Sequence, residues 1–151
     1  MVDTIRDLLD GKRRVLHSVT ASDPVSVAVR MMSSLKIGAL PVIERGALVG
    51  IFSERDVLIR IVDKGLDPDK TPVSEVMTPH PTLVPSTMEV DEAMRMMSKG
   101  HFRHLPVVDK GQLVGMVSMG DIAARVIHNQ QSQLNSMTGA GKMSLGRRPA
   151  G

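Results

Sequence analysis

The heptapeptide GIFSERD at residues 50–56 is followed, 65 residues later, by GMVSMGD at residues 115–121. At the same offset the chain aligns on itself without a gap, and the tripeptide LPV at 40–42 falls on an identical LPV at 105–107. Repetition in the same order and at one constant spacing indicates an internal duplication. The sequence therefore predicts two copies of one structural unit rather than a single irregular domain.

Both units, expected at 12–65 and 77–129, share one pattern of apolar residues. An apolar stripe at spacings of three and four, from Val25 to Leu35 in the first unit, predicts an amphipathic helix. Two short apolar runs around a glycine-bearing turn follow it and predict a β-hairpin. A short strand is expected before this helix, and a second helix is expected after the serine of the heptapeptide. The result is an α+β fold of two β-α-β-β-α units, each too small to bury much surface alone, packed face to face.

The net positive charge of the chain lies near its two ends. Residues 130–151 hold three basic side chains and no acid, whereas residues 15–129 sum to a net charge of −1. The sequence pI of about 9.6 therefore describes the tail more than the body. Residues 139–141, Gly-Ala-Gly, are expected to end the last helix, and the tail beyond them is expected to be flexible.

Composition argues against several classes of function. The chain has no cysteine, which removes disulfides, thiolate metal sites and cysteine nucleophiles. Its five histidines show no metal-ligand spacing, no Ser/His/Asp combination suits a catalytic triad, and there is no Walker-type or GxGxxG loop. No apolar run has the length of a membrane span, and the first residues lack the apolar region of a signal peptide. We therefore expect a cytoplasmic protein that is not an enzyme and binds neither a metal ion nor a membrane.

The Ser-x-x-Asp pattern in each heptapeptide has two compatible interpretations. As a local signal, Ser53 or Ser118 caps a helix that has an acid in its first turn. As a binding site, the same helix start offers N–H groups and a hydroxyl to a phosphate. The Asp56 and Asp121 carboxylates can meanwhile accept two hydrogen bonds from the cis-diol of a ribose. Phosphate, ribose and an aliphatic slot for a purine together describe a nucleotide site, but the motif alone does not decide between capping and binding.

The duplicated unit, its LPV strand and its G-h-h-S-x-x-D ending (h, hydrophobic) resemble a pair of CBS domains, the Bateman module. The match covers residues 12–129 and both copies of the motif. The resemblance implies a pseudo-twofold pair within one chain, of the stand-alone type, with two clefts for adenosine nucleotides and no catalytic cofactor. AMP is the expected ligand, with ATP, ADP, NAD(H) and S-adenosylmethionine as alternatives. It also implies a homodimer and a partner protein, not named by the sequence, that responds to the bound nucleotide.

The resemblance builds each cleft from residues of both units. One cleft would combine the motif of the first unit with the early strand and hairpin start of the second: Ile51, Ser53, Arg55, Asp56, Met77, Thr78, Thr82, Phe102, Arg103 and His104. The other would combine the second motif with the same parts of the first unit: Met116, Ser118, Asp121, His17, Ile37, Gly38 and Ala39.

The two clefts are expected to differ in how well they bind phosphate. Arg103 is the best candidate for phosphate pairing, because a guanidinium can form two parallel hydrogen bonds with phosphate oxygens. At the equivalent positions the first unit has Gly38 and Ala39 in place of Arg103 and His104. We therefore expect the Ser53/Asp56 cleft to bind phosphorylated ligands more tightly than the Ser118/Asp121 cleft.

Two other functions stay open. A protein-interaction scaffold with vestigial clefts would bind no nucleotide at all. A nucleic-acid-binding protein would use the basic tail at 130–151, and its affinity for DNA would fall steeply with salt. The nearly neutral body argues against nucleic-acid binding, and so does the scarcity of aromatic side chains, two Phe and no Trp or Tyr, on which bases could stack.

Overall fold

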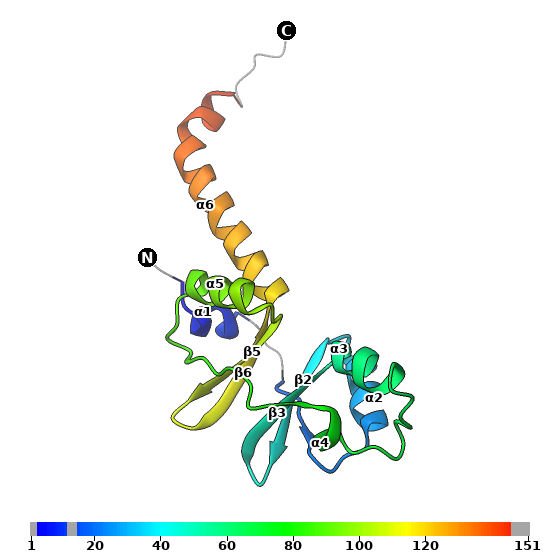
Figure 1. Ribbon diagram of the computed structural model, residues 1–151. Helices are drawn as coiled ribbons and strands as arrows, with labels where there is room; N and C mark the ends of the chain where they lie inside the picture. Colours follow the sequence, from blue (N-terminus) through cyan, green and yellow to red (C-terminus); the bar gives the residue numbers. More distant parts are fainter. Residues whose placement is uncertain (1–2, 12–14, 146–151) are drawn as a thin grey trace.

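A β-hairpin lies at the centre of each repeat (Figure 1). The computed structural model describes residues 3–11 and 15–145. Each hairpin turns through a basic residue and a glycine that both have positive φ, Arg45 and Gly46 in one and Lys110 and Gly111 in the other. Two such residues in succession give the turn whose twist matches that of the strands. The hairpins are β2 (Ala39–Glu44) with β3 (Ala47–Ser53), and β5 (His104–Asp109) with β6 (Gln112–Ser118).

Short strands extend the first hairpin into a four-stranded sheet in the order β1-β2-β3-β4. β1 (Val19–Thr20) runs parallel to β2, and β4 (Thr78–Pro79) runs antiparallel to β3. In the second repeat, the short strand expected before the helix is reduced to one parallel bridge between Val84 and Val107. The α+β fold of two similar halves that the sequence predicts is confirmed.

Two longer helices bury their apolar stripes against these sheets. α2 (Val25–Leu35) and α5 (Val90–Gly100) are the amphipathic helices expected from the periodicity, and each ends at a residue in the left-handed conformation. The cores they cover are aliphatic apart from Phe52, which is fully buried. The helix after the first motif is short: α3 (Glu54–Asp56) continues into a π-helix, η1 (Val57–Val62).

Each core also contains one short helix from outside the repeat to which that core belongs. α1 (Ile5–Asp10) precedes the first repeat, yet its Ile5 and Leu8 are buried in the core of the second. α4 (Val73–Val76), between the repeats, places its two terminal valines in the core of the first. Equivalent backbone hydrogen bonds fix both helices, from Ile5 N–H to Met88 O (2.9 Å) and from Val73 N–H to Asp23 O (2.9 Å). The two halves are therefore interleaved rather than merely adjacent.

The last helix, α6 (Met119–Leu145), is 27 residues long and projects from the body (Figure 1). The prediction that the glycines at 139–141 end this helix is wrong. Glycine lowers helix stability by about 1 kcal/mol per residue but keeps its backbone N–H, so it weakens a helix without blocking it. Every side chain from residue 130 to residue 138 is exposed. The rest of the tail, 146–151, lies outside the described residues, and no helix within 3–11 and 15–145 is long and apolar enough to cross a membrane.

Candidate ligand-binding clefts

The two Ser-x-x-Asp motifs form helix caps of the same geometry. The backbone N–H of Asp56 donates to Ser53 Oγ (3.3 Å), and that of Ser53 donates to Asp56 Oδ2 (2.9 Å). In the second repeat, the backbone N–H of Asp121 donates to Ser118 Oγ (3.1 Å), and that of Ser118 donates to Asp121 Oδ2 (2.9 Å). The capping interpretation is therefore confirmed. It remains compatible with binding, because the cap uses one carboxylate oxygen and fixes where the other lies.

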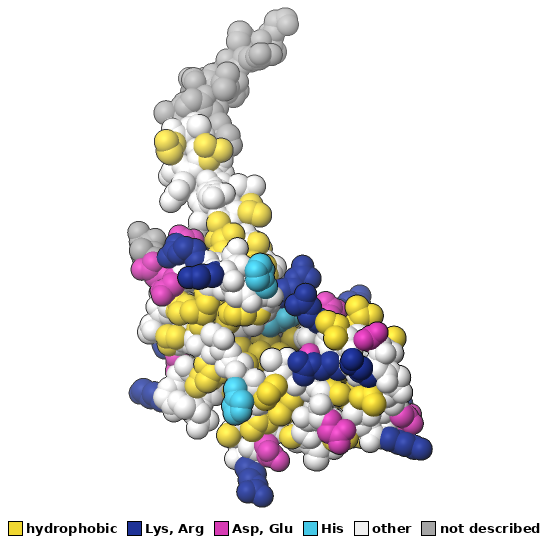
Figure 2. Space-filling view, viewed as in Figure 1, with side chains coloured by type: hydrophobic (Ala, Val, Ile, Leu, Met, Phe, Trp, Pro, Cys, Tyr) yellow, Lys and Arg dark blue, Asp and Glu magenta, His cyan; other side chains and the backbone are white. Residues whose placement is uncertain are grey.

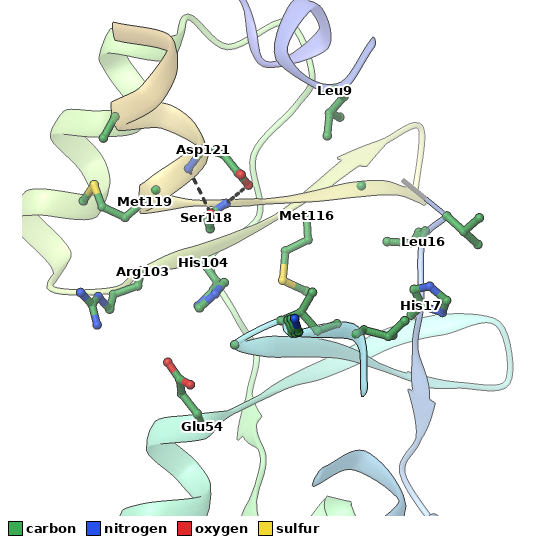
Figure 3. Close-up of a pocket in the computed structure, with 18 of the residues that line it drawn as sticks. Leu9, Leu16, His17, Glu54, Arg103, His104, Met116, Ser118, Met119 and Asp121 are labelled. Atoms are coloured by element: carbon green, nitrogen blue, oxygen red, sulfur yellow. Dashed lines mark hydrogen bonds between the residues drawn. The ribbon is translucent and has the colours of Figure 1, made fainter. Parts of the chain in front are cut away.

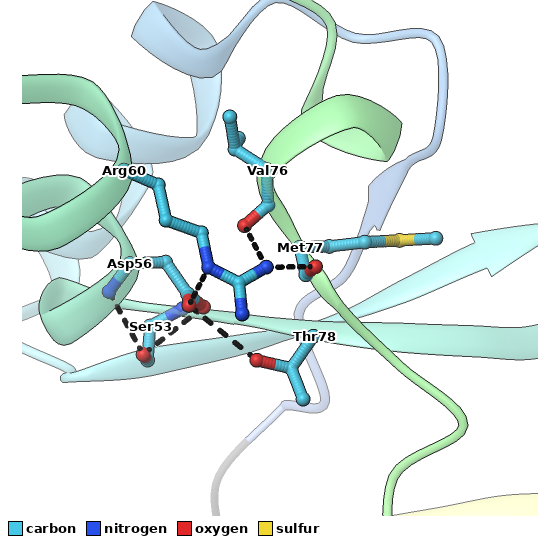
Figure 4. A network of polar contacts seen from close by, with 6 residues as sticks. All are labelled: Ser53, Asp56, Arg60, Val76, Met77 and Thr78. Atoms are coloured by element: carbon cyan, nitrogen blue, oxygen red, sulfur yellow. Dashed lines mark hydrogen bonds and ion pairs between the residues drawn. The ribbon is translucent and has the colours of Figure 1, made fainter. Parts of the chain in front are cut away.

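Arg60 holds the carboxylate of Asp56 from the side opposite the cap (Figure 4). Its Nε lies 3.6 Å from Asp56 Oδ1, and its Nη1 donates to the carbonyls of Val76 (3.2 Å) and Met77 (2.8 Å). Thr78 Oγ1 donates to the same Asp56 oxygen (3.4 Å). Asp56 is consequently only 5% exposed although it is charged. The guanidinium thus joins the first motif to the end of α4 and the start of β4.

The equivalent arginine of the second repeat, Arg125, has a different partner. Its Nε and Nη2 donate to the two carboxylate oxygens of Asp3 (2.8 and 3.0 Å), and Asn129 donates to the same carboxylate. These hydrogen bonds lower the pKa of Asp3 to about 2, with Arg125 the largest cause. The pair fastens Asp3, two residues before α1, to α6. The two repeats therefore share the Ser-x-x-Asp motif, but their equivalent arginines pair with different carboxylates, Asp56 in the first repeat and Asp3 in the second.

Two clefts open between the repeats, one beside each motif. The Asp56 cleft has a volume of about 1060 Å³, and the Asp121 cleft, shown in Figure 3, has a volume of about 880 Å³. Both volumes are typical of small-molecule sites and large enough for a nucleotide.

The Asp56 cleft brings together nine of the ten residues expected for it. They are Ile51, Ser53, Arg55, Asp56, Thr78, Thr82, Phe102, Arg103 and His104. The exception is Met77, whose side chain packs against the core of the first repeat close to Gly50. Its carbonyl nevertheless accepts the hydrogen bond from Arg60 that supports Asp56.

The Asp121 cleft brings together six of the seven residues expected for it. They are His17, Ile37, Gly38, Met116, Ser118 and Asp121. The exception is Ala39, the first residue of β2, which is buried and does not line the cleft.

Sequence reasoning missed several residues that line the clefts, some of them close in sequence to those it identified. Leu58 and Ile59 line the Asp56 cleft from η1, and His80 and His101 line it from loops. The Asp121 cleft is lined by apolar residues from α1 and the segment before β1, among them Leu9, Val15 and Leu16. The location of Leu9 depends on α1 packing in the second repeat, and no short-range signal in the sequence shows that packing.

Arg103 and His104 line both clefts, so the expectation that they serve the Asp56 cleft alone is wrong. The cause is a backbone hydrogen bond from Met119 N–H to Arg103 O (2.7 Å), which holds the start of the second hairpin against its own motif. The equivalent bond in the first repeat joins Glu54 N–H to Gly38 O (3.0 Å). Each hairpin start therefore lies between the clefts, and the Asp121 cleft also has an arginine for a phosphate.

The charges between the clefts are mixed. Glu54 from α3 points toward Arg103 and His104 (Figure 3). Burial lowers the pKa of His104, although the carboxylates of Glu54 and Asp121 act in the opposite direction. A lowered histidine pKa means that the imidazole is uncharged at neutral pH. Among the described residues, no group of three or more His, Asp or Glu side chains could hold a metal ion.

Taken together, each cleft offers an apolar wall, a capped serine and carboxylate, and basic side chains near its opening. A family model described as CBS domain matches residues 4–63 and 73–128. The chain belongs to the CBS domain family. Proteins of this family are typically regulatory, non-catalytic modules, and the modules generally sense nucleotides.

Two relatives of the chain are described as CBS domain-containing proteins. The chain is 34% identical over 115 residues to YhcV of Bacillus subtilis, covering 76% of this chain and 81% of that protein. It is also 34% identical over 143 residues to the mitochondrial protein CBSX3 of Arabidopsis thaliana, covering 89% of this chain and 69% of that protein.

Solved structures of CBS proteins have the same fold. A CBS-domain protein from Burkholderia ambifaria is 35% identical, with a TM-score of 0.81, over 85% of this chain and 96% of that chain. The structure of CBSX2 in complex with AMP is 30% identical, with a TM-score of 0.67, over 78% of this chain and 92% of that chain.

Proposed function

We propose that this CBS pair binds an adenosine nucleotide in the clefts between its repeats, with AMP as the representative ligand, and regulates a partner protein without catalysis. The observation that carries the proposal is the composition of the clefts. Each one joins a Ser-x-x-Asp cap to an apolar wall and to Arg103, residues that suit a ribose, a purine and a phosphate. The AMP bound to CBSX2, whose fold this chain shares, supports the same ligand class.

The residues would divide the ligand between them. Asp56 and Asp121 would accept the ribose hydroxyls in their respective clefts, because a fixed carboxylate is a strong acceptor for both. The purine would lie on apolar side chains, such as Ile51 and Phe102 in the Asp56 cleft and Met116 in the Asp121 cleft. The phosphate would bind near Arg103, whose side chain is exposed at the opening of both clefts.

We propose in addition that two copies of the chain associate through their helices. The helix η1 lies beside the Asp56 cleft, and its Leu58, Ile59 and Val62 side chains are exposed. Apolar side chains are also exposed along the projecting part of α6 (Figure 2). Exposed apolar surface that groups on helices is typical of protein–protein contacts.

Titration calorimetry of the purified chain with AMP and with adenosine tests the nucleotide proposal. We expect both ligands to bind, since each contains the ribose and the purine. Mass spectrometry of small molecules that co-purify with the native protein identifies the natural ligand within the class. If neither AMP, ADP, ATP nor NAD(H) binds at millimolar concentration, the proposal is wrong and a scaffold with vestigial clefts is favoured.

A further inference from the structure

We infer that the two clefts are coupled through a shared junction, so that one chain binds a first phosphorylated nucleotide tightly and a second one at least about tenfold more weakly. The inference rests on the proposed nucleotide binding and adds its regulation. It comes from the residues that belong to both clefts at once: Gly38, Glu54, Arg103, His104 and Met119.

The junction is built from both repeats and is closely packed. A Cβ placed on Gly38 would lie 3.2 Å from Glu54 Oε1 and 3.4 Å from His104 Cε1, so the carboxylate and the imidazole both cover this glycine. The two backbone bonds from Glu54 to Gly38 and from Met119 to Arg103 hold the hairpin starts on either side. A ligand group that enters the junction from one cleft therefore meets the same side chains as a group that enters from the other.

The charges at the junction favour one phosphate and oppose two. Arg103 can compensate a single phosphate from either side, whereas burial lowers the pKa of His104 and so disfavours its charged form. A second phosphate would meet the first one and the carboxylate of Glu54, because both clefts share Glu54 and Arg103. Two unit charges of like sign a few ångströms apart repel by about 1–4 kcal/mol at a protein surface, and about 1.4 kcal/mol already corresponds to a tenfold loss of affinity.

The nucleoside parts of two ligands do not share this limit. The ribose acids, Asp56 and Asp121, belong to separate clefts, and so do the apolar walls that contain Ile51 in one and Met116 in the other. Adenosine has no phosphate to place at the junction. We therefore expect two adenosine molecules to bind independently, and only phosphorylated ligands to interfere with each other.

Glu54 is a junction charge that only the first repeat supplies. It occupies the second position after Phe52 in the first motif, whereas the second motif has the uncharged Met119 at the equivalent place. Substituting Glu54→Gln removes a negative charge from both clefts and keeps the size of the side chain. The substitution should tighten both AMP binding events, with the larger gain for the second, and should leave adenosine unchanged.

Methyl NMR spectra of the full chain can follow the two clefts separately. The Ile51 methyls report on the Asp56 cleft and the Met116 methyl reports on the Asp121 cleft, with assignment from Ile51→Val and Met116→Leu. With adenosine, both reporters should shift over the same concentration range, apart from any difference in intrinsic affinity. With AMP, one reporter should shift first. The other should shift only at a concentration at least about tenfold higher than the concentration at which it shifts with adenosine.

Two variants test the part played by Arg103. Arg103→Gln should weaken both AMP binding events, whereas Arg95→Gln, at an exposed arginine outside both clefts, should weaken neither.

The outcomes separate this inference from the proposed function. If both reporters respond to AMP at equal concentrations, or if Arg103→Gln weakens only one of the two events, the coupling is wrong while nucleotide binding stands. If Glu54→Gln leaves the difference between the two AMP events unchanged, the junction is not its cause. If neither reporter responds to AMP or adenosine, the proposed function fails and the coupling fails with it.

Discussion

Asp56 has two tasks in the first repeat, because it closes the cap of α3 and presents its other oxygen to Arg60, Thr78 and the cleft. A buried carboxylate needs hydrogen bonds and an opposite charge, and Asp56 has both, from Ser53, Thr78 and Arg60. A ribose that binds Asp56 enters a network already oriented by Arg60 and the carbonyl of Met77. The local signal for a helix start and the proposed binding site are therefore one arrangement.

We predict that Asp56→Ala weakens AMP binding at the Asp56 cleft about tenfold or more. The substitution removes charge-assisted hydrogen bonds to the ribose, each of which contributes about 1.5–3 kcal/mol. Calorimetry measures the affinity, and thermal unfolding measures the accompanying loss of the cap. Asp69→Ala is the matched control, because Asp69 is exposed and lies in the loop between the repeats. Equal AMP affinities for the wild type and Asp56→Ala would remove Asp56 from the site.

Gly50 and Gly115 are equivalent in sequence but face different neighbours, and this difference predicts different tolerance of a side chain. A Cβ on Gly50 would lie 2.6 Å from Met77 Sδ and 2.9 Å from the carbonyl oxygen of Thr78. The three atoms nearest to a Cβ on Gly115 all belong to the flexible side chain of Leu9, the first of them at 2.8 Å. Gly50→Ala must displace backbone, and we expect it to cost about 1–3 kcal/mol of stability. Chemical denaturation should show a smaller loss for Gly115→Ala, and an equal or smaller loss for Gly50→Ala would contradict the close approach of β3 and β4.

At the scale of elements, α1 and α6 are joined by the ion pair between Asp3 and Arg125. The pKa of Asp3 is lowered to about 2, so the pair stabilises the fold above the ordinary pKa of 3.8 and is lost as the pH falls from there toward 2. We predict that Asp3→Asn lowers the free energy of unfolding by about 1 kcal/mol at neutral pH, a value reduced by solvent screening.

Urea unfolding of the wild type and Asp3→Asn between pH 7 and pH 2 measures this effect. The difference in stability should stay constant down to about pH 5 and shrink below it. Asp10→Asn, at the end of α1, controls for the loss of one negative charge from the same segment. A difference that does not change with pH would show that the carboxylate of Asp3 is not held in its charged form by Arg125.

The elements also show what could be predicted from the sequence and what could not. The hairpins and α2 were predictable, because their apolar periods and turn glycines act over a few residues. The exchange of α1 and α4 between the cores was not, because each has only two buried apolar residues and therefore no recognisable period. The length of α6 was misjudged for a related reason, since two glycines weaken a helix without ending it.

For the whole molecule, the resemblance to CBS pairs predicted two clefts and the residues expected in each, but not how the clefts relate. Repeat symmetry places Arg103 opposite Gly38, and the sequence therefore predicts that only the Asp56 cleft has an arginine for a phosphate. Whether a long side chain reaches one cleft or both depends on how the repeats pack, and packing acts between residues far apart in the chain. The shared position of Arg103 therefore became visible only in the three-dimensional structure.

α6 leads to a prediction about the assembly of the molecule. Between residues 130 and 138 it makes no contact that buries a side chain, and its Leu134 and Met137 are 61% and 83% exposed. A single helix of this length that contains Asn, Ser and Thr is marginal in water. Ile127, Leu134 and Met137 follow one another at spacings of seven and three, which places them along one stripe of the helix. A second copy with the same stripe would cover it.

We therefore predict a dimer in solution, with about twice the chain mass of 16.4 kDa by light scattering at micromolar concentration. Leu134→Asp combined with Met137→Asp should shift the protein toward the monomer, because a charge on each helix at the same contact opposes association. Leu83→Asp, a similarly exposed leucine outside the helices, should leave the mass unchanged. If the double variant stays dimeric while Leu58→Asp combined with Val62→Asp dissociates, the contact is made by η1 instead of α6. A mass of about 16.4 kDa for the wild type, with and without AMP, would show that neither helical surface pairs with a second copy.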